Sequence, residues 1–370
     1  MDAQPQTAPP ADAALPARAQ PSRLRRFLWP SWRQRKGLLR AEAWLLLLTC
    51  YVLLAFAWVW PQDWRNISTG YVAASWVALL VRAAQFHIGL LVGLIALIAA
   101  FGKGRRLFLA SVPVVLFTLV PPAWRAMPKD PPAAAPGAPT LRVMSVNLLM
   151  INERYDEVID RVQSERPDVL VLQEYTGWWH RSMQKALSVE YPHCRFEPRD
   201  DSFGAAVYSR TPFVGDAPGG PKLGTWAAAS PQQRVVVDVG GRHVAIYNVH
   251  LLPPRRLDYT FEHRLQFADL TDALSKEKLP AVVVGDFNWT ESMPQHAALR
   301  GLGWRDAQDV AGTGRGATWP MNSIFRHLPG IRLDHAYLGP SLTCTRVRTV
   351  ETPGSDHKAL VADVALRAAP

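Results

Sequence analysis

The chain has 370 residues, more than one average domain requires, and a formal net charge of +10. Residues 1–140 contain fifteen Lys and Arg against five Asp and Glu, whereas residues 141–370 contain twenty-six of each. The basic excess therefore lies outside the C-terminal part. This removes overall charge as an argument for nucleic-acid binding there, because a duplex binder needs clustered basic surface.

The first 42 residues are predicted to be a disordered basic tail. Residues 1–22 are rich in Ala, Pro and Gln without apolar periodicity, and seven Lys and Arg follow by residue 40. Ala43–Trp60 then has eighteen residues without a charge, enough for about 27 Å of helix. The run lies too far from the N-terminus, and is too long, for a cleaved signal peptide, so we favour an uncleaved anchor.

Two further apolar segments, at about 84–101 and 107–122, complete a predicted transmembrane region over 43–123 with three spans. Residues 71–83 are also apolar, but they include Arg82, which would cost about 2.5–3.5 kcal/mol in mid-membrane. We therefore predict that this segment is an interfacial extension. The basic tail and the Lys103–Arg106 turn belong on the cytoplasmic side, which places the catalytic domain outside the cytoplasm of a multi-pass cell-membrane protein.

A Pro/Ala-rich linker at 124–140 should hold a soluble α/β domain, 141–370, away from the membrane. Apolar runs predict strands at 141–148, 168–174, 204–210, 234–239, 243–250, 281–286, 333–338 and 359–366. Helical patterns predict helices at 154–165, 178–188, 258–276 and 292–300. The domain holds two of the three cysteines, Cys194 and Cys344. We favour free thiols over a disulfide between them.

Six polar motifs each follow an apolar, strand-like run. They are Ser-Val-Asn147, Leu-Gln-Glu174, Tyr-Asn-Val-His250, Gly-Asp286-Phe-Asn288, Leu-Asp334-His335 and Gly-Ser-Asp356-His357. Together they supply the carboxylates, amides and imidazoles needed to bind a divalent cation and hydrolyse a phosphate ester.

Each motif alone has a plainer interpretation. Glu174 could be the exposed first residue of a loop, and the Asp286–Asn288 element could be an Asx-capped turn. The latter is nevertheless the most specific motif, because Gly285 permits close backbone approach and two polar side chains follow it. A carboxylate there can take a proton from water while an amide orients that water. His335 is predicted to be structural.

The ordered set of motifs resembles the endonuclease/exonuclease/phosphatase superfamily, which includes DNase I-like nucleases, inositol polyphosphate phosphatases and neutral sphingomyelinases. Gly204–Arg210, a strand that ends in Ser-Arg, and Thr318-Trp319-Pro320 add to this resemblance, which covers nearly all of 141–370. It implies a four-layer α-β-β-α sandwich of two mixed sheets, preceded here by transmembrane helices, with the active site at one end.

The resemblance also implies roles for individual residues. Glu174 would be the principal ligand of Mg²⁺, or of Mn²⁺ as the alternative, with Asn147 and Asp356 in the same metal or phosphate site. Asp286 would activate the attacking water. His250 and His357, the latter oriented by Asp334, would donate to phosphate oxygens. Arg210 and Asn288 are the predicted substrate-binding residues.

The resemblance leaves the substrate open. The predicted function is hydrolysis of a phosphodiester, which could be a lipid headgroup, a nucleic acid or a small molecule. A phosphomonoesterase, a DNase-like endonuclease and a non-catalytic binding protein are the alternatives. Residues 177–203 and 252–263 are the expected rims of the site, and their aromatic and Arg side chains suit bases or lipid headgroups equally. Beyond substrate and lipid bilayer, no obligate protein partner is expected.

Overall fold

The computed structural model describes residues 32–102, 104–215, 219–226, 229–321 and 324–368. The chain divides into two compact units, 1–48 and 49–370. In the first unit the described part is helical, because α2 runs from Trp32 to Val59. Residues 32–42, predicted to be disordered, are thus helical, as good helix formers such as Arg, Leu, Glu and Ala favour. The rest of the predicted tail, 1–31, lies outside the described residues.

Three further helices precede the sheets: α3 (Thr69–Ala83), α4 (Gln85–Phe101) and α5 (Arg105–Ala126). Among the described residues, two helices are long and apolar enough to cross a membrane, Gly37–Val59 within α2 and all of α5. The pair α3 and α4 bends by 58° at its junction and would supply a third span only if it is one broken span. The predicted count of three spans stays a prediction.

Two mixed β-sheets form the centre of the C-terminal domain. The six-stranded sheet has the order β10 (Leu342–Glu351), β11 (Lys358–Leu366), β1 (Leu141–Asn147), β2 (Val169–Gln173), β4 (Ala205–Ser209), β3 (His193–Glu197). The five-stranded sheet has the order β5 (Gln233–Asp238), β6 (His243–His250), β7 (Ala281–Asp286), β9 (Asp334–Leu338), β8 (Arg305–Asp306). In each sheet one central pair is parallel, β1 with β2 and β6 with β7, and the other pairs are antiparallel.

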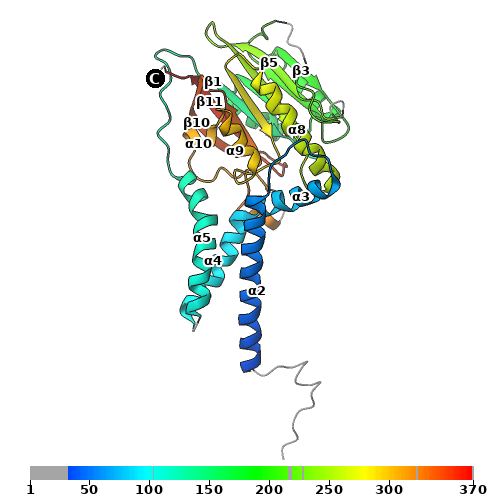
Figure 1. The fold of residues 1–370 in the computed structure, drawn as a ribbon. Coiled ribbons are helices and arrows are strands. Elements are labelled where there is room, and N and C mark those ends of the chain that lie inside the picture. Colours follow the sequence, from blue (N-terminus) through cyan, green and yellow to red (C-terminus); the bar gives the residue numbers. More distant parts are fainter. Residues whose placement is uncertain (1–31, 103, 216–218, 227–228, 322–323, 369–370) are drawn as a thin grey trace, which may run out of the picture. The chain divides into compact units, whose positions relative to one another are not determined.

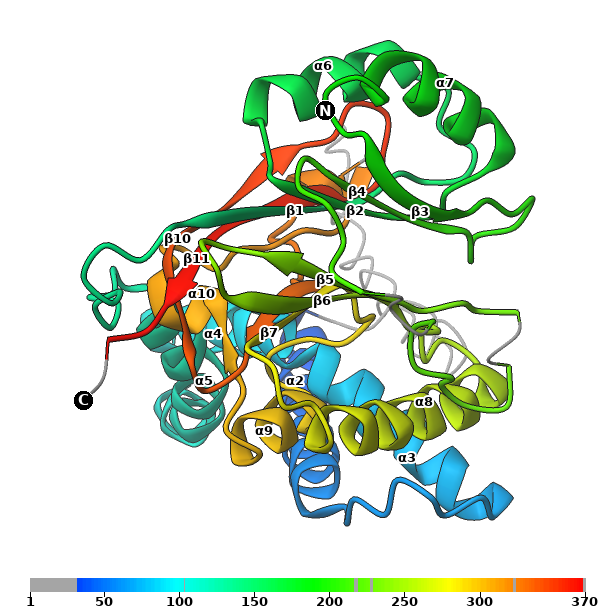
Figure 2. The same cartoon turned by 90° about the horizontal axis from the view of Figure 1, so that it is seen from above.

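The sheets pack face to face and helices cover both outer faces, as Figure 2 shows. The inner faces contribute a core rich in Val, including Val143, Val171 and Val282. On one outside lie α6 (Tyr155–Glu165) and α7 (Gly177–Leu187), packed on a second cluster. On the other lie α8 (Leu257–Ser275) and α9 (Pro294–Gly301), packed on a third. The predicted four-layer sandwich is confirmed. Two short helices, α10 (Ala307–Ala311) and η1 (Ile324–His327), complete the described elements.

Several local predictions need correction. Within the predicted linker, Ala134 and Ala135 pair through their backbones with residues 366–367 at the end of β11, while the predicted spacing from a membrane stays a prediction. The predicted helix at 178–188 is confirmed as α7, whose Trp179 is fully buried, so of the predicted rim 177–203 it is Ser202 and Phe203 that line the cavity. Cys194 and Cys344 are free, as expected, since they lie on β3 and β10 at opposite edges of one sheet.

The segment 71–83 is a helix that packs on the catalytic domain. Figure 1 shows α3 beside α8, and the two helices are in contact. Leu79 of α3 is 2% exposed and joins the core that contains Phe267 of α8. Arg82 is buried, and its Nε donates to the Ser292 carbonyl at 2.5 Å. The Arg82 guanidinium, which would be costly in lipid, therefore has a hydrogen-bond partner in the catalytic domain.

Candidate active site

The polar motifs meet at one end of the two sheets. Parallel neighbours end at the same sheet edge, so Asn147 of β1 lies near Glu174, which follows β2. For the same reason His250 of β6 lies beside Asp286 of β7. β9 runs antiparallel to β7 and starts at this edge, with Asp334 opposite Asp286. A cavity of about 600 Å³ opens there, lined by Glu174, His250, Asp286, Asn288, Asp356 and His357 among others.

The Asp286 carboxylate is at the centre of this group. One oxygen accepts from the backbone N–H of Asn288 at 2.9 Å and the other from the Asn147 side-chain amide at 3.1 Å. The Nε2 atoms of His250 and His357 both lie 3.7 Å from the second oxygen. Burial raises the pKa of Asp286, while the imidazole of His357 opposes that rise. A buried carboxylate with a raised pKa and an open cavity in front of it is suited to accept a proton.

His357 is held as a cation. Burial alone would lower its pKa, but the carboxylates of Asp334 and Asp286 raise the pKa of His357 to about 10. The Asp334 carboxylate accepts from Nδ1 at 2.8 Å, and Asp334 is 1% exposed. The Nε2–H then faces Asp286 and the cavity. Burial lowers the pKa of His250, so the second imidazole tends to be neutral. The site thus pairs a charged donor with a neutral one.

The chemistry of the donor atoms fits a hard cation between Glu174 and Asp356. Burial raises the pKa of Glu174, because at this position its charge is only partly compensated, by the backbone N–H of Met150 at 2.9 Å and the Asn147 amide at 3.2 Å. Asp356 has a buried Oδ1 with no hydrogen-bond partner among the described residues. Two incompletely paired carboxylates on one cavity match the oxygen donors that Mg²⁺ prefers.

A second grouping at the site could hold a metal by distance alone, Asp286, Asp334 and His357. In this grouping the His357 Nδ1 already contacts the Asp334 carboxylate at 2.8 Å, and its Nε2 faces Asp286 at 3.7 Å. Glu174 and Asp356, whose carboxylates are less completely paired, are the other residues of this cavity that could hold a cation. Asn147 links this pair to Asp286 through its amide N–H, while its Oδ1 accepts from Leu149.

Backbone conformation sets these side chains at the cavity. Glu174 and Asn288 both have left-handed backbones, with φ values of 56° and 52°, which is uncommon for residues other than glycine and concentrates at functional sites. Gly285 has φ +147°, and a Cβ there would lie 1.9 Å from the Val249 carbonyl oxygen. Of the two roles that a glycine here permits, a tight turn or close backbone approach, the structure shows the second: Gly285 lets β7 lie against β6 next to Asp286.

Two residues outside the six motifs, Thr318 and Trp319, hold site residues in position. Thr318 Oγ1 accepts the backbone N–H groups of Leu333 and Asp334, at 3.1 and 3.2 Å. Trp319 Nε1 donates to Asp356 Oδ2 at 3.1 Å. Thr318 and Trp319 thus hold Asp334 and Asp356 in position. In the sequence, the one signal for this role was the resemblance of Thr318-Trp319-Pro320 to the superfamily's turn.

The interface between the sheets adds a buried polar contact near the site. Gln173 Nε2 donates to Asn248 Oδ1 at 2.7 Å, joining β2 to β6. The Asn248 amide donates in turn to backbone carbonyls of Leu172 and Ala206. Gln173 directly precedes Glu174 in the sequence, and Asn248 lies two residues before His250. Satisfied buried polar networks of this kind favour one arrangement of the packed layers.

The structure corrects the prediction for Arg210. β4 runs antiparallel to β2, so Arg210 lies at the start of β2, where its N–H donates to Asp168, and not at the Glu174 end. Its guanidinium pairs with Glu190. His335 is structural, as predicted: Nδ1 contacts Asp306 at 2.6 Å and Nε2 contacts the Trp289 carbonyl at 3.0 Å. The nearby grouping of His296, Asp306 and His335 is part of this buried network.

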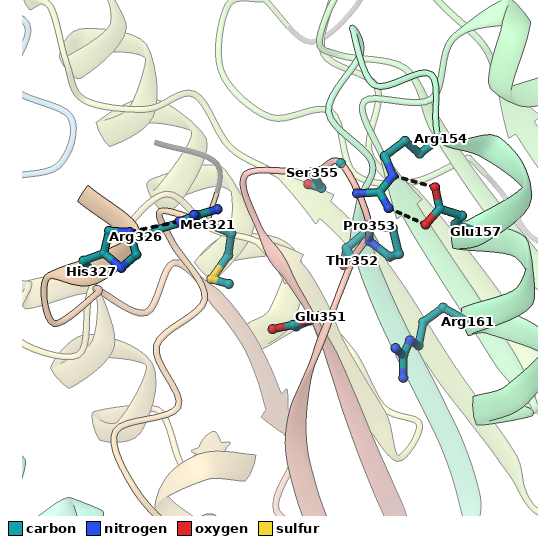
Figure 3. A pocket seen from close by; sticks show the side chains of 11 residues that line it. Arg154, Glu157, Arg161, Met321, Arg326, His327, Glu351, Thr352, Pro353 and Ser355 are labelled. Atoms are coloured by element: carbon teal, nitrogen blue, oxygen red, sulfur yellow. Dashed lines mark hydrogen bonds and ion pairs between the residues drawn. The ribbon is translucent and has the colours of Figure 1, made fainter. Parts of the chain in front are cut away.

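A larger cavity of about 710 Å³ lies behind the Gly354–Ser355 turn (Figure 3). Some of its charged side chains contact one another. Arg154 donates to Glu157 at 2.6 Å, and Arg326 contacts His327 at 3.3 Å, as the dashed lines in Figure 3 mark. Since this cavity is not lined by Glu174, Asp286 or either imidazole of the strand-end motifs, we place the chemistry in the smaller one.

Comparison with known proteins agrees with this geometry. The family model described as Endonuclease/Exonuclease/phosphatase family matches residues 144–357, more than half of the chain. A search of curated proteins found no match. Among solved structures, truncated TDP2 of Caenorhabditis elegans is similar at 19% identity and TM-score 0.50, over 63% of this chain and 100% of that one.

Two other solved structures lie close to the same level. An endonuclease/exonuclease/phosphatase from Beutenbergia cavernae has 21% identity and TM-score 0.49, over 63% of this chain and 73% of that one. The 3′ phosphatase NExo from Neisseria, bound to product DNA hairpin, has 23% identity and TM-score 0.48, over 60% and 98%. The matching family model spans every site residue from Asn147 to His357, so the chain belongs to the endonuclease/exonuclease/phosphatase family.

Proposed function

We propose that this protein is a divalent-metal-dependent phosphodiesterase. Nucleases and phosphatases both hydrolyse phosphoester bonds, so family membership supports a phosphoesterase in general. The observation that carries the finer proposal is the position of Asp286. Its carboxylate lies between two imidazoles, at 3.7 Å from each, and is joined through Asn147 to Glu174 of the proposed cation site.

The side chains divide the work of hydrolysis. Asp286 takes a proton from water as the water oxygen attacks phosphorus, and the P–O bond to the leaving alcohol breaks in line. The leaving oxygen departs as an alcohol with a proton from solvent. His357, charged and fixed by Asp334, and His250 donate to the phosphate oxygens as negative charge builds up on them. Asn288 is fixed by donation to the Leu251 carbonyl at 2.8 Å and borders the same space.

Glu174 and Asp356 would hold Mg²⁺, with Mn²⁺ as a substitute. A bound cation there would polarise a phosphate oxygen and offset its charge. We further propose that the apolar helix α4 joins the membrane-length helices α2 and α5 to give three spans of a cell membrane, which put the basic N-terminal residues in the cytoplasm and the catalytic domain on the extracytoplasmic face. The length and apolarity of α2 and α5 support embedding, and the basic residues of the first 42 positions support that orientation.

The test is an assay of the purified full chain with bis(p-nitrophenyl) phosphate, p-nitrophenyl phosphate and plasmid DNA, with Mg²⁺ or EDTA. We expect diester hydrolysis that EDTA abolishes and added Mg²⁺ restores. Preference for the monoester would identify a phosphomonoesterase, and preference for DNA a nuclease. No hydrolysis of any ester would support a non-catalytic binding protein. A reporter fused after Pro139 that reads out in the cytoplasm would contradict the proposed orientation.

A further inference from the structure

One wall of the active-site cavity is apolar and comes from outside the family domain. Leu80 and Ala83 of α3 line the cavity together with Met293, Ile331 and Pro253 of the domain. The family model begins only at residue 144, so α3 lies outside its match. A segment that precedes the domain in sequence therefore shapes the space in front of Asp286.

Several contacts fix α3 in this place. Leu79 is buried in the domain core, and the Arg82 guanidinium donates to the carbonyl of Ser292, next to Met293. Before α3, the Trp64 ring packs edge-on against Phe267, with centroids 4.5 Å apart. Arg264 of α8 donates to the Asn66 carbonyl at 2.8 Å. The apolar wall is thus part of the folded site.

The charge of the cavity does not suit a polyanion. Among its described lining residues, Arg255 is the one Lys or Arg, and its guanidinium lies 5.5 Å from the Tyr259 ring centroid. A nucleic-acid backbone is normally bound through several cationic contacts. A single phosphate group, by contrast, is served by the two imidazoles and the cation site already described.

The surface segment that leads to Ile331 is mixed, with exposed apolar side chains on either side of exposed Arg326 and His327. The segment leading to Ile331 exposes Ile324 and Leu328, at 81% and 57%. It meets the first turn of α4, where His87 Nε2 contacts the Pro329 carbonyl at 2.6 Å. Exposed apolar side chains next to helices of membrane-spanning character are suited to a lipid–water boundary.

We propose that the substrate is an amphiphilic phosphodiester whose alkyl or acyl group lies against Leu80 and Ala83 while its phosphate lies at Asp286. This rests on the proposed phosphodiesterase function and names the class of its substrate. The apolar group replaces water on the α3 wall. Burial of each methylene is worth about 0.8 kcal/mol, which corresponds to about fourfold in affinity.

The experiment compares methyl p-nitrophenyl phosphate with octyl p-nitrophenyl phosphate, using the full chain in phosphatidylcholine nanodiscs with Mg²⁺. We expect kcat/KM to be at least about 100-fold higher for the octyl ester, as burial of four methylenes would give. Leu80→Gln should lower the octyl-to-methyl ratio at least about fivefold, through loss of two or so buried methylene equivalents. Val77→Gln is the matched control: Val77 lies one turn away on α3 and is similarly exposed, at 38% against 41%, but does not line the cavity. It should leave the ratio unchanged.

Each result is decisive. Equal hydrolysis of both esters, or equal effects of the two variants, would overturn the substrate assignment and leave the phosphodiesterase proposal standing. Hydrolysis of neither ester would instead count against the phosphodiesterase proposal itself. Preferential cleavage of plasmid DNA would also overturn the amphiphile. If the octyl ester is preferred, an assay with vesicles of phosphatidylglycerol distinguishes the source of the natural substrate. Release of the lipid headgroup indicates a bilayer lipid, and an intact lipid indicates a soluble amphiphile. Both outcomes agree with the inference.

Discussion

Replacement of Asp334 by Asn removes the charge that keeps His357 protonated. The Asp334 carboxylate accepts from Nδ1 at 2.8 Å, and the next carboxylate, that of Asp286, is 3.7 Å from Nε2. Both members of the pair are buried, with Asp334 1% and His357 5% exposed. Loss of one partner of a buried ion pair costs about 3–5 kcal/mol. If that cost falls on the transition state, kcat drops roughly 10²- to 10⁴-fold.

The assay is steady-state hydrolysis of bis(p-nitrophenyl) phosphate by the full chain with Mg²⁺. Asp309→Asn is the matched control, because Asp309 makes a similar contact with His296, at 3.1 Å, outside the cavity. It should leave kcat near the wild-type value even if it lowers the melting temperature. A folded Asp334→Asn protein with kcat within fivefold of wild type would refute the role given to His357. An equal loss in Asp309→Asn would show that the effect is structural.

Three other predictions concern the cation, the backbone and acid stability. Glu174→Gln should weaken Mg²⁺ binding at least about tenfold, the usual order for a removed charged ligand, and isothermal titration with Mg²⁺ that shows no change would contradict the assigned site. Gly285→Ala should destabilise the fold by more than about 2 kcal/mol, because its Cβ would meet the Val249 carbonyl oxygen at 1.9 Å. The control Gly301→Ala should not destabilise the fold, because a Cβ at residue 301 would have no neighbouring atom within 4 Å. Thermal unfolding of the two variants compares them. Although burial opposes it, Arg332 and His335 lower the pKa of Asp306. The folded protein therefore favours the ionised carboxyl, so its stabilisation is present above the unfolded pKa of about 3.9 and is lost as the pH falls below it. Asp306→Asn should flatten the fall in chemical-denaturation midpoint below about pH 4, and an unchanged slope would show that other carboxyls cause it.

The central strands and most site residues could be predicted from the sequence for one physical reason. A strand buried on both faces is a short run of apolar residues, and polar residues that end such runs reach the sheet edge. β2, β6 and β7 all follow this pattern, and Glu174, His250 and Asp286 were found through it. The edge strand β3 has an intermediate to exposed burial pattern, so its sequence carried no such signal.

The prediction for Arg210 was wrong because a sequence pattern does not show in which direction a strand runs within its sheet. The residue ends an apolar run in the same way as Glu174 does, but β4 pairs with β2 in antiparallel orientation. Its end therefore lies at the opposite edge of the sheet, more than a strand length from the site. A pattern of apolar residues is the same in either direction, so only pairing partners distinguish a site residue from a structural one here.

The apolar N-terminal helices show a second limit of the same kind. In the sequence, Arg82 could be judged only by its cost in lipid, which made 71–83 an extension at the membrane surface. In the structure the same arginine is buried on the carbonyl of Ser292, and Leu79 enters the domain core. In this chain the charged residue of the apolar helix α3, Arg82, lies where that helix packs on the catalytic domain. Because the docking point borders Met293 and the cavity, the segment that attaches the domain also becomes one wall of its active site. The segment that precedes the family domain and one wall of the cavity are therefore parts of the same folded unit.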